Sequence, residues 1–365
     1  MRIAQVAPLY ESVPPRLYGG TERVVSYLTE ELVRQGHHVT LFASGDSVTS
    51  ARLVPCSPRS LRQDEGCRDP LARHFLLLEE VFAAAAQFDV LHFHIDFLHF
   101  PLSRRVTVPT LTTLHGRLDL PDLALLYREY REMPLVSISD AQRSVLPAAA
   151  WHGTVHHGVP DRLLGYRKGH GGYLAFLGRI SPEKRLDRAI EIARRAGRRL
   201  LVAAKVDRAD AEYFEKEIEP LLSDPHVTFL GEIGESEKNE FLGGAAALLF
   251  PIDWPEPFGL VLIEAMACGT PVIAYRGGSV EEIVSPGETG FIVSNLDEAV
   301  EAVARLGEID RRHCRRVFEK CFTAGRMARD YTRLYAELLE PKVVPFVSRA
   351  ALKASEAPSG AAPSR

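Results

Sequence analysis

Short apolar runs alternate along this chain with longer segments whose apolar positions recur at helical spacing. The first pattern is typical of buried strands and the second of amphipathic helices. Strands that alternate with helices predict an α/β fold, with parallel sheets and crossover helices. In the first half the strand-like runs are Arg2–Ala7, His38–Ala43, Val90–His94, Thr110–Leu114, Leu135–Ile138 and Thr154–His157.

The segment Thr21–Gln35 shows the helical pattern most clearly. Thr21 can serve as the N-cap, and Gly36 ends the helix. One apolar stripe runs along it, formed by Val24, Val25, Leu28 and Leu32.

A polar, glycine-rich stretch at 166–172 follows the sixth strand, and such a shift in composition marks a linker. The pattern then restarts, which predicts two Rossmann-like halves with a ligand cleft between them. We expect domains over 1–168 and 169–322, a helix over 323–340, and a disordered Pro-, Ala- and Ser-rich tail over 341–365. The second half has strands at Tyr173–Leu177, Arg199–Ala204, Val227–Leu230, Ala247–Phe250 and Pro271–Ala274, and helices at Glu183–Ala196, Asp210–Leu222, around Glu264 and onward to Leu339.

Composition excludes several classes of protein. The 365 residues are 46% hydrophobic and 25% charged, which is typical of a soluble globular protein, and the net charge of −4 gives no reason to expect nucleic acid. The five cysteines form no CxxC pair, so we expect reduced thiols. The N-terminus enters a strand directly and the chain has no membrane-spanning apolar run, so the expected location is cytoplasmic.

Two carboxylates lie eight positions apart in the string EPFGLVLIE at 256–264. Glu256 stands in a Pro/Gly turn, and Glu264 lies a little over two helical turns further on, so it can face the helix mouth that Glu256 flanks. Helix N-termini attract anions. A phosphate at Gly259 would have one acid beside it and another one layer deeper, a layout that fits a nucleotide sugar. The plainer interpretation is a buried helix whose acids are only paired or solvated.

The whole string resembles the donor-site signature of retaining glycosyltransferases of family 4. Phe258-Gly259 follow the first acid, and Ala267-x-Gly269-x-Pro271-Val272 follow the second. The resemblance spans about residues 1–340 and is strongest over 173–293. It implies the GT-B architecture, in which the last helix, about Thr323–Leu339, crosses back onto the first domain. It also implies that Glu264 binds the ribose, and that the transferred sugar lies beside Glu256, Pro257, Phe258, Gly259 and Leu260.

Arg179 and Lys184 bracket a turn between a strand and a helix, in the string GRISPEK at 178–184. Fixed cations beside a departing phosphate oxygen lower the barrier to its release. Solvated surface residues are the plainer alternative, but the string resembles the family's Gly-Arg-x-x-x-x-Lys diphosphate element. The family often has glycine after the lysine, and Arg185 at that position leaves the shape of the loop open.

A glycine loop, YGGTE at 18–22, follows the first strand. Gly19 and Gly20 let backbone N–H groups approach a ligand closely, and the resemblance places them over the donor phosphates. Neither Gly-x-Gly-x-x-Gly nor a Walker-type Gly-x-x-x-x-Gly-Lys occurs, so NAD and ATP are poor candidates and no cofactor is expected.

Further candidates end strands or follow them. His115 ends a strand at the edge where open sheets bind ligands, and by resemblance it contacts the donor hexose. The resemblance places the nucleobase on the backbone around Glu232 and Ile233. Lys205 ends another strand and can add a third cation.

For three further sets of residues the sequence leaves alternatives open. His92, His94 and Asp96 alternate along one strand, where acceptor binding or packing is preferred to a metal site because the family chemistry needs no metal. The Arg-rich segment at 311–316 predicts a solvated helix face, with peripheral membrane contact as the second choice. The charged run at 59–68 is either an acceptor loop or without function.

Together these features predict a metal-independent retaining transferase that moves a hexose from a nucleoside diphosphate to a hydroxyl of a small molecule or glycan. Arg179, Lys184 and the helix mouth at Gly259 would stabilise the leaving group in place of a metal ion. Same-face attack is preferred to a covalent intermediate on Glu256, because no second carboxylate is clearly placed. UDP-glucose is the first donor and GDP-mannose the second. A nucleotide-sugar epimerase and a non-catalytic sugar-nucleotide-binding protein are the alternatives.

Overall fold

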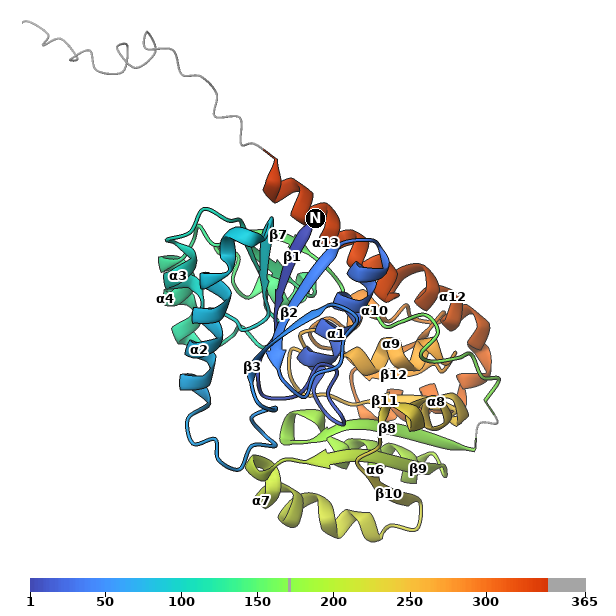
Figure 1. Cartoon of the computed structure of the whole chain (residues 1–365). Helices are drawn as coiled ribbons and strands as arrows, with labels where there is room; N and C mark the ends of the chain where they lie inside the picture. The colour runs from blue at the N-terminus through green and yellow to red at the C-terminus, as the bar shows by residue number, and fades with distance from the viewer. Residues whose placement is uncertain (170–171, 341–365) are drawn as a thin grey trace, which may run out of the picture.

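The computed structural model describes residues 1–169 and 172–340, and within them the chain forms two parallel α/β domains (Figure 1). The first sheet has seven strands in the order β3-β2-β1-β4-β5-β6-β7, and the second has six in the order β10-β9-β8-β11-β12-β13. Two Rossmann-like halves are therefore confirmed. The predicted tail over 341–365 and residues 170 and 171 of the predicted linker lie outside the described residues.

All neighbouring strands of the first domain are parallel, as the alternating pattern predicted, and the connection from β3 to β4 crosses from one side of β1 to the other. Its strands are β1 (Arg2–Val6), β2 (His38–Ser44), β3 (Arg52–Ser57), β4 (Val90–Phe93), β5 (Thr110–Thr113), β6 (Leu135–Ser137) and β7 (Trp151–Thr154). Its helices are α1 (Gly20–Arg34), α2 (Pro70–Ala83), α3 (Phe100–Ser103), α4 (Pro121–Glu129) and α5 (Asp140–Ser144).

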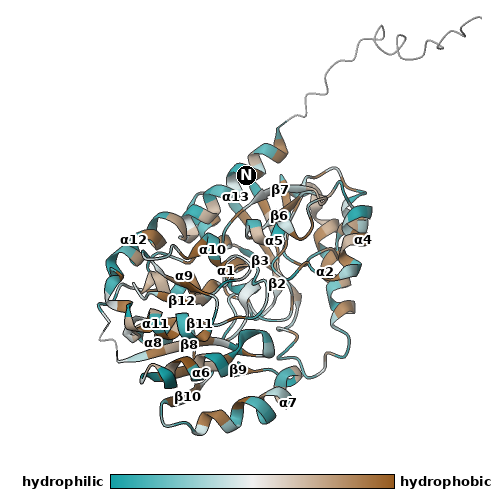
Figure 2. Cartoon of the chain, turned by 180° about the vertical axis from the view of Figure 1, so that it is seen from behind, coloured by the Kyte–Doolittle hydropathy of each residue, from teal (hydrophilic) through white to brown (hydrophobic). Residues whose placement is uncertain are grey.

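The second domain repeats this organisation. Its strands are β8 (Tyr173–Ile180), β9 (Arg199–Val206), β10 (Val227–Gly231), β11 (Ala247–Phe250), β12 (Val272–Tyr275) and β13 (Gly290–Val293). Its helices are α6 (Leu186–Arg195), α7 (Ala211–Tyr213), α8 (Glu235–Gly244), α9 (Leu260–Ala267), α10 (Val280–Ile283), α11 (Leu296–Ala304) and α12 (Arg311–Cys321). Figure 2 shows apolar residues on the strands and on the helix sides that face them.

The last helix, α13 (Ala324–Leu339), returns to the first domain and packs against α1, as the resemblance implied (Figure 1). Thr323 caps it by accepting a hydrogen bond from the backbone N–H of Arg326. Its Tyr335 hydroxyl accepts a hydrogen bond from Gln5 Nε2 at 3.0 Å, deep in the first domain. The C-terminal end of the described chain thus forms part of the first domain's core.

Several local predictions were wrong. The segment Asp210–Leu222 is helical as predicted, but α7 passes into a π-helical turn at Phe214–Ile218 and a 3-10 turn at Glu219–Ser223 instead of forming one regular α-helix. Strands β3 and β13 were not predicted, and the strand expected at Thr154–His157 lies three residues earlier. Thr21 is not an N-cap, since α1 begins at Gly20 after the cap residue Gly19.

The five cysteines are free. Among the described residues, no helix has the length and apolar character needed to cross a bilayer.

Candidate active site

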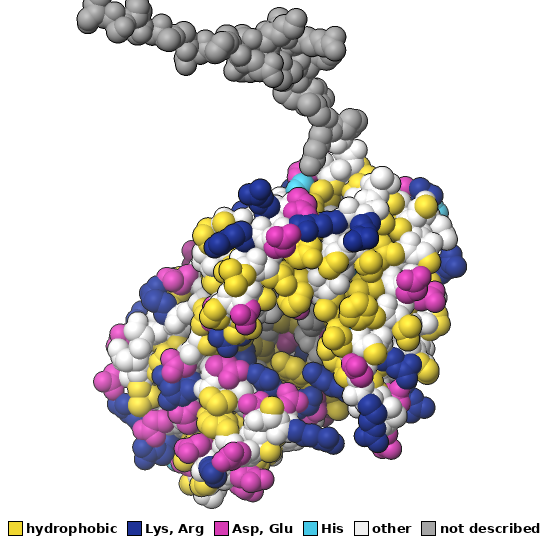
Figure 3. Space-filling view, turned by 90° about the vertical axis from the view of Figure 1, so that its left-hand side faces the viewer, with side chains coloured by type: hydrophobic (Ala, Val, Ile, Leu, Met, Phe, Trp, Pro, Cys, Tyr) yellow, Lys and Arg dark blue, Asp and Glu magenta, His cyan; other side chains and the backbone are white. Residues whose placement is uncertain are grey.

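Both sheets direct the carboxyl ends of their strands toward one cleft of about 700 Å³. Figure 3 shows this hollow between the two halves, with Lys and Arg side chains at its rim. Every residue that the sequence predicted for the site lines it: Gly19, Gly20, His115, Arg179, Lys184, Lys205, Glu232, Ile233, Glu256, Pro257, Phe258, Gly259, Leu260 and Glu264.

The turn that carries the two cations depends on Arg185. This residue adopts a left-handed conformation, with φ of 53°, which is the conformation that glycine takes most easily. Its guanidinium is held by Asp187 and Asp253, each at 2.8 Å, so the turn keeps a glycine-like shape without glycine. Arg185 stands where the family often has glycine, but the turn keeps its shape, and Arg179 and Lys184 both lie at the cleft.

Lys184 lies directly against Glu256, with Nζ paired to Oε2. The same oxygen accepts a hydrogen bond from Trp254 Nε1 at 3.0 Å. The ammonium also lies 5.0 Å from the centre of the Trp254 ring, so it has a cation–π partner. Glu256 and Trp254 together hold the Lys184 charge at the cleft wall.

Arg179 sits among acids of its own domain. Glu183 accepts from it at 2.6 Å, and Asp207 and Asp210 lie at 3.8 and 3.7 Å. Lys205 pairs with Asp207 at 2.9 Å, so both cations share one carboxylate. An incoming polyanion would compete with these acids for cations that are already in position.

Helix α9 begins immediately after Gly259, whose φ of 79° strongly favours glycine. A Cβ there would lie 3.0 Å from Leu262 and 3.2 Å from Phe250. The first N–H groups of the helix therefore stand at the cleft without intrahelical partners. Glu264, two turns deeper and 2% exposed, lines the same cleft and pairs with Lys238 at 2.7 Å.

The part of the first-domain wall around His115 is made of neutral imidazoles. His115 Nε2 lies 2.9 Å from His94 Nδ1, and His94 Nε2 donates to Gln5 Oε1 at 2.8 Å. Burial lowers the pKa of His115 to about 3, so this ring is uncharged at neutral pH. Its Nδ1 atom is buried and has no hydrogen-bond partner among the described residues.

His92 and His94 lie side by side, with ring centres 4.1 Å apart, but they are not arranged as metal ligands. The two nitrogens of His92 are bonded to Tyr335 and Thr113, each at 2.8 Å. Asp96 has φ of 52°, which breaks the strand alternation, and it lines the cleft. In the described part of the chain, no group of three or more His, Cys, Asp or Glu side chains could hold a metal ion.

The two domains touch where the glycine loop meets the segment after β10. The backbone N–H of Tyr18 donates to Glu232 at 2.8 Å. Arg23 pairs with Glu235, and the Tyr27 hydroxyl donates to the same carboxylate at 3.3 Å. These contacts bring the glycine loop over the second domain.

The cleft is also lined by residues that were not predicted as site residues from the sequence. Trp254 stands two positions before Glu256, and Arg23 follows the glycine loop, so both adjoin recognised motifs. Arg62 comes from the charged run at 59–68 and lies at the cleft, paired with Glu11 at 3.0 Å. Lys238 carries no local signal, because only the fold brings it to Glu264.

The Arg-rich segment is not simply a solvated face. Arg311 donates to the carbonyls of Ala245 and Gly243 at 2.8 and 3.0 Å, and Arg315 donates to the carbonyl of Ala267 at 2.7 Å. These carbonyls lie at the C-terminal ends of α8 and α9, where the last carbonyl groups of a helix have no intrahelical partners. Two of the arginines therefore cap neighbouring helices.

Two family profiles match successive parts of the chain. Glycosyltransferase Family 4 matches residues 18–171, and Glycosyl transferases group 1 matches residues 167–319. The chain belongs to the GT-B glycosyltransferases of family 4. The first profile ends and the second begins within the glycine-rich stretch that follows the first sheet.

Curated relatives of this glycosyltransferase include a phosphatidyl-myo-inositol mannosyltransferase of Propionibacterium freudenreichii, 28% identical over 84% of this chain and 86% of that protein. A probable sucrose-phosphate synthase of Thermosipho melanesiensis is 41% identical over 83 residues, which span 22% of this chain and only 19% of that longer protein. Among solved structures, Anabaena HepE in complex with UDP and glucose superposes with a TM-score of 0.71 at 17% identity, covering 92% of this chain and all of that one. At this identity the likeness shows the fold.

Proposed function

We propose that this glycosyltransferase transfers a hexose, with retention of configuration, from a nucleoside diphosphate to an acceptor hydroxyl. One observation carries the proposal: Arg179, Lys184 and the mouth of α9 converge on the cleft that Glu256 and Glu264 also line. The pyrophosphate would bind the cations and the helix mouth, and the ribose would bind Glu264. The hexose would then lie between Glu256 and His115.

The leaving group is the centre of the proposed mechanism. As the glycosidic bond breaks, negative charge grows on the phosphate oxygen, and Lys184 and Arg179 would stabilise it without a metal ion. Glu256 has its Oε2 atom engaged by Lys184 and Trp254, which suits a residue that holds sugar hydroxyls better than a nucleophile. We therefore favour attack by the acceptor on the face from which the diphosphate departs.

UDP-glucose is the proposed donor and GDP-mannose the second choice. The HepE neighbour was solved with UDP-glucose, and the Propionibacterium relative is named a mannosyltransferase. The base would contact mainly backbone at 231–234, next to the end of β10.

A donor screen tests the proposal. Thermal-shift titration against UDP, GDP and ADP sugars should raise the unfolding midpoint most for the true donor, because ligands stabilise by mass action. With that donor and a panel of hydroxyl acceptors, free nucleoside diphosphate should appear only when an acceptor is present, EDTA should leave the rate unchanged, and proton NMR should show the donor's anomeric configuration in the product. Inverted product, or conversion of the donor sugar without an acceptor, would contradict it.

A further inference from the structure

The two walls that would enclose the hexose belong to different domains. His115 follows β5 in the first domain, whereas Glu256–Gly259 precede α9 in the second. A transferase must fix the separation of such walls, since a displacement of about 1 Å at the reacting centre can cost a hundredfold in rate. The structure joins them through a short segment at the start of α5.

Gln142 fastens this segment to the His115 loop. Its Nε2 donates to the carbonyls of Leu114 and Gly116, at 2.9 and 2.8 Å, which flank His115 on both sides. Its Oε1 accepts from the backbone N–H of Ile138 at 2.9 Å. With all of these bonds made and only 4% of its surface exposed, Gln142 holds the loop in one position.

Ser139 fastens the same segment to the donor loop. Its hydroxyl donates to the carbonyl of Pro257 at 2.7 Å, and the residue is fully buried. The same oxygen accepts from the backbone N–H of Gln142 at 2.9 Å, so one hydroxyl links the two loops. From the other side, Ser279 donates to the carbonyl of Phe258 at 2.8 Å.

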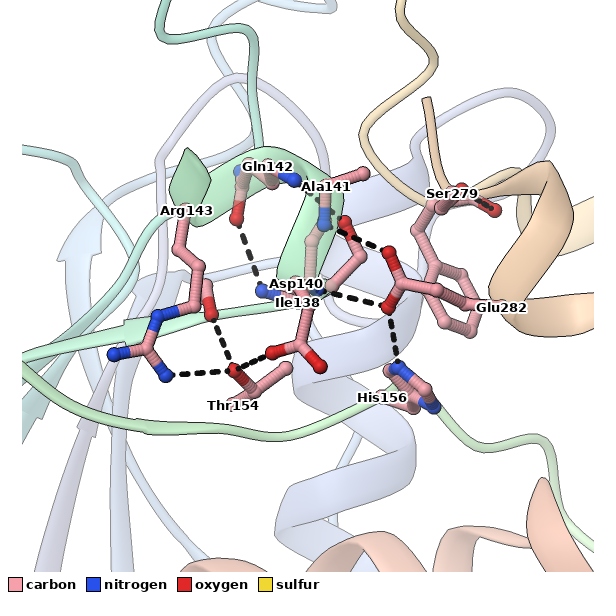
Figure 4. Close-up of polar contacts among 12 residues, drawn as sticks. Ile138, Asp140, Ala141, Gln142, Arg143, Thr154, His156, Ser279 and Glu282 are labelled. Carbon is pink, nitrogen blue, oxygen red and sulfur yellow. Dashed lines mark hydrogen bonds and ion pairs between the residues drawn. The ribbon is translucent and has the colours of Figure 1, made fainter. Parts of the chain in front are cut away.

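Glu282 closes the arrangement across the domains (Figure 4). From α10 of the second domain it accepts the first N–H groups of α5, those of Asp140 at 2.8 Å and Ala141 at 2.7 Å. His156, just beyond β7, places its Nε2 3.0 Å from the same carboxylate. A carboxylate at a helix N-terminus is favourable, and this one belongs to the opposite domain.

We propose that Ser139, Gln142 and Glu282 form an interdomain bracket that positions His115 against the donor loop and so fixes the width of the hexose subsite. The bracket residues do not line the cleft, so they act through His115 and Pro257. This inference rests on the proposed function. The nucleotide half of the donor would bind Arg179, Lys184, Glu264 and the mouth of α9, which all belong to the second domain and do not depend on its distance from the first. Loss of the bracket should therefore impair hexose transfer and leave nucleotide binding intact.

The chain offers a matched pair of variants. Glu282→Gln keeps the size of the side chain but removes its charge and one acceptor, whereas the adjacent Glu281 is 53% exposed and pairs only with Arg276 at the surface. We expect Glu282→Gln to lower kcat/KM for the donor at least about tenfold, because hydrogen bonds to charged groups are among the strongest. Glu281→Gln should stay within about twofold of the unaltered protein.

The affinity for the nucleoside diphosphate product distinguishes a loss of positioning of His115 from a general disruption of the fold. In Glu282→Gln and in Ser139→Ala, the Kd for UDP (or for GDP, if that is the product released) should stay within about twofold of the unaltered value. A parallel loss of nucleotide affinity, or equal activity in Glu281→Gln and Glu282→Gln, would overturn the bracket.

A second measurement does not depend on the reaction. Hydrogen–deuterium exchange should become faster at residues 114–117 and 257–260 in Glu282→Gln and in Ser139→Ala, and should stay unchanged over β8 and β9. Unchanged exchange at both loops would overturn the proposal. If the unaltered protein transfers no hexose, the proposed function fails while this exchange experiment still decides whether the bracket exists.

Discussion

The wall of the cleft that comes from the second domain carries paired charges, whereas the part of the first-domain wall around His115 carries neutral imidazoles. On one side Lys184 pairs with Glu256 and Lys238 with Glu264. On the other side His94 is hydrogen-bonded to His115 and to Gln5. Most buried polar groups of both walls have partners, but the chemistry differs, and His115 Nδ1 is left without one among the described residues.

The difference matches the two ends of a sugar nucleotide. A diphosphate is an anion, and cations that neighbouring acids already hold at the cleft can bind its phosphate oxygens in place of those acids. A hexose is neutral, and an uncharged ring nitrogen can bond its hydroxyl without the cost of burying a charge. The comparison predicts that the two walls respond differently to pH and to substitution.

The buried neutral histidines of the first domain should make this domain sensitive to mild acid. Burial lowers the pKa of His92, His94, His99 and His157 well below the usual value near 6.5. Below that value the unfolded chain binds protons that the folded chain does not, so stability falls as the pH falls. Between pH 7 and 5.5 we expect a loss of about 1 kcal/mol for each histidine, on the order of 4 kcal/mol for the four.

Tryptophan fluorescence can follow this loss in one domain. The chain has two tryptophans, so Trp254→Phe leaves Trp151 in β7 as a reporter of the first domain during urea unfolding. His99→Gln should reduce the pH effect by about 1 kcal/mol. His226→Gln, at a half-exposed position in the second domain, should leave it unchanged. A first domain equally stable at both pH values would show that these rings take up protons in the folded state.

The charged wall should respond most to loss of Lys184. Under the proposed function, Lys184→Ala would remove the cation from the departing phosphate, and we expect turnover at saturating donor to fall by at least about a hundredfold, the usual scale for one oxyanion partner. Lys216→Ala is the control, because Lys216 is 67% exposed and pairs only with Glu212 on the surface. Near-normal turnover in Lys184→Ala would remove the charge-stabilisation argument.

The charged wall was also the more predictable of the two. Glu256 and Glu264, like Arg179 and Lys184, lie within short windows whose geometry follows from one turn and one helix. The partners of these residues were harder to predict from the sequence, because Lys238 meets Glu264 only through the packing of α8 on α9. No sequence pattern links Gln5 to Tyr335, which are 330 positions apart.

The missed strands have a similar explanation. Strand β3 lies at the sheet edge, is mostly half-exposed and contains Pro55, so it lacks the apolar run of the buried strands. Strand β13 is short and starts at Gly290, where a Cβ would lie 2.0 Å from the carbonyl of Val272. Each of these two strands is placed by its pairing with a neighbour strand and not by the strand preference of its own residues.

The smallest expected effect is at His115, and it tests the neutral wall directly. Under the proposed function, His115→Ala would remove one hydrogen bond to the hexose, so kcat/KM for the donor should fall about tenfold while the Kd of the released nucleoside diphosphate stays the same. His226→Ala should change neither value, since His226 lies outside the cleft. Because the pKa of His115 is lowered to about 3, the unaltered protein should show no loss of kcat/KM from this ring between pH 8 and 5. A decline near pH 6.5 that disappears in His115→Ala would mean that the ring titrates, and the wall facing the hexose would then be charged in the same way as the wall facing the phosphates.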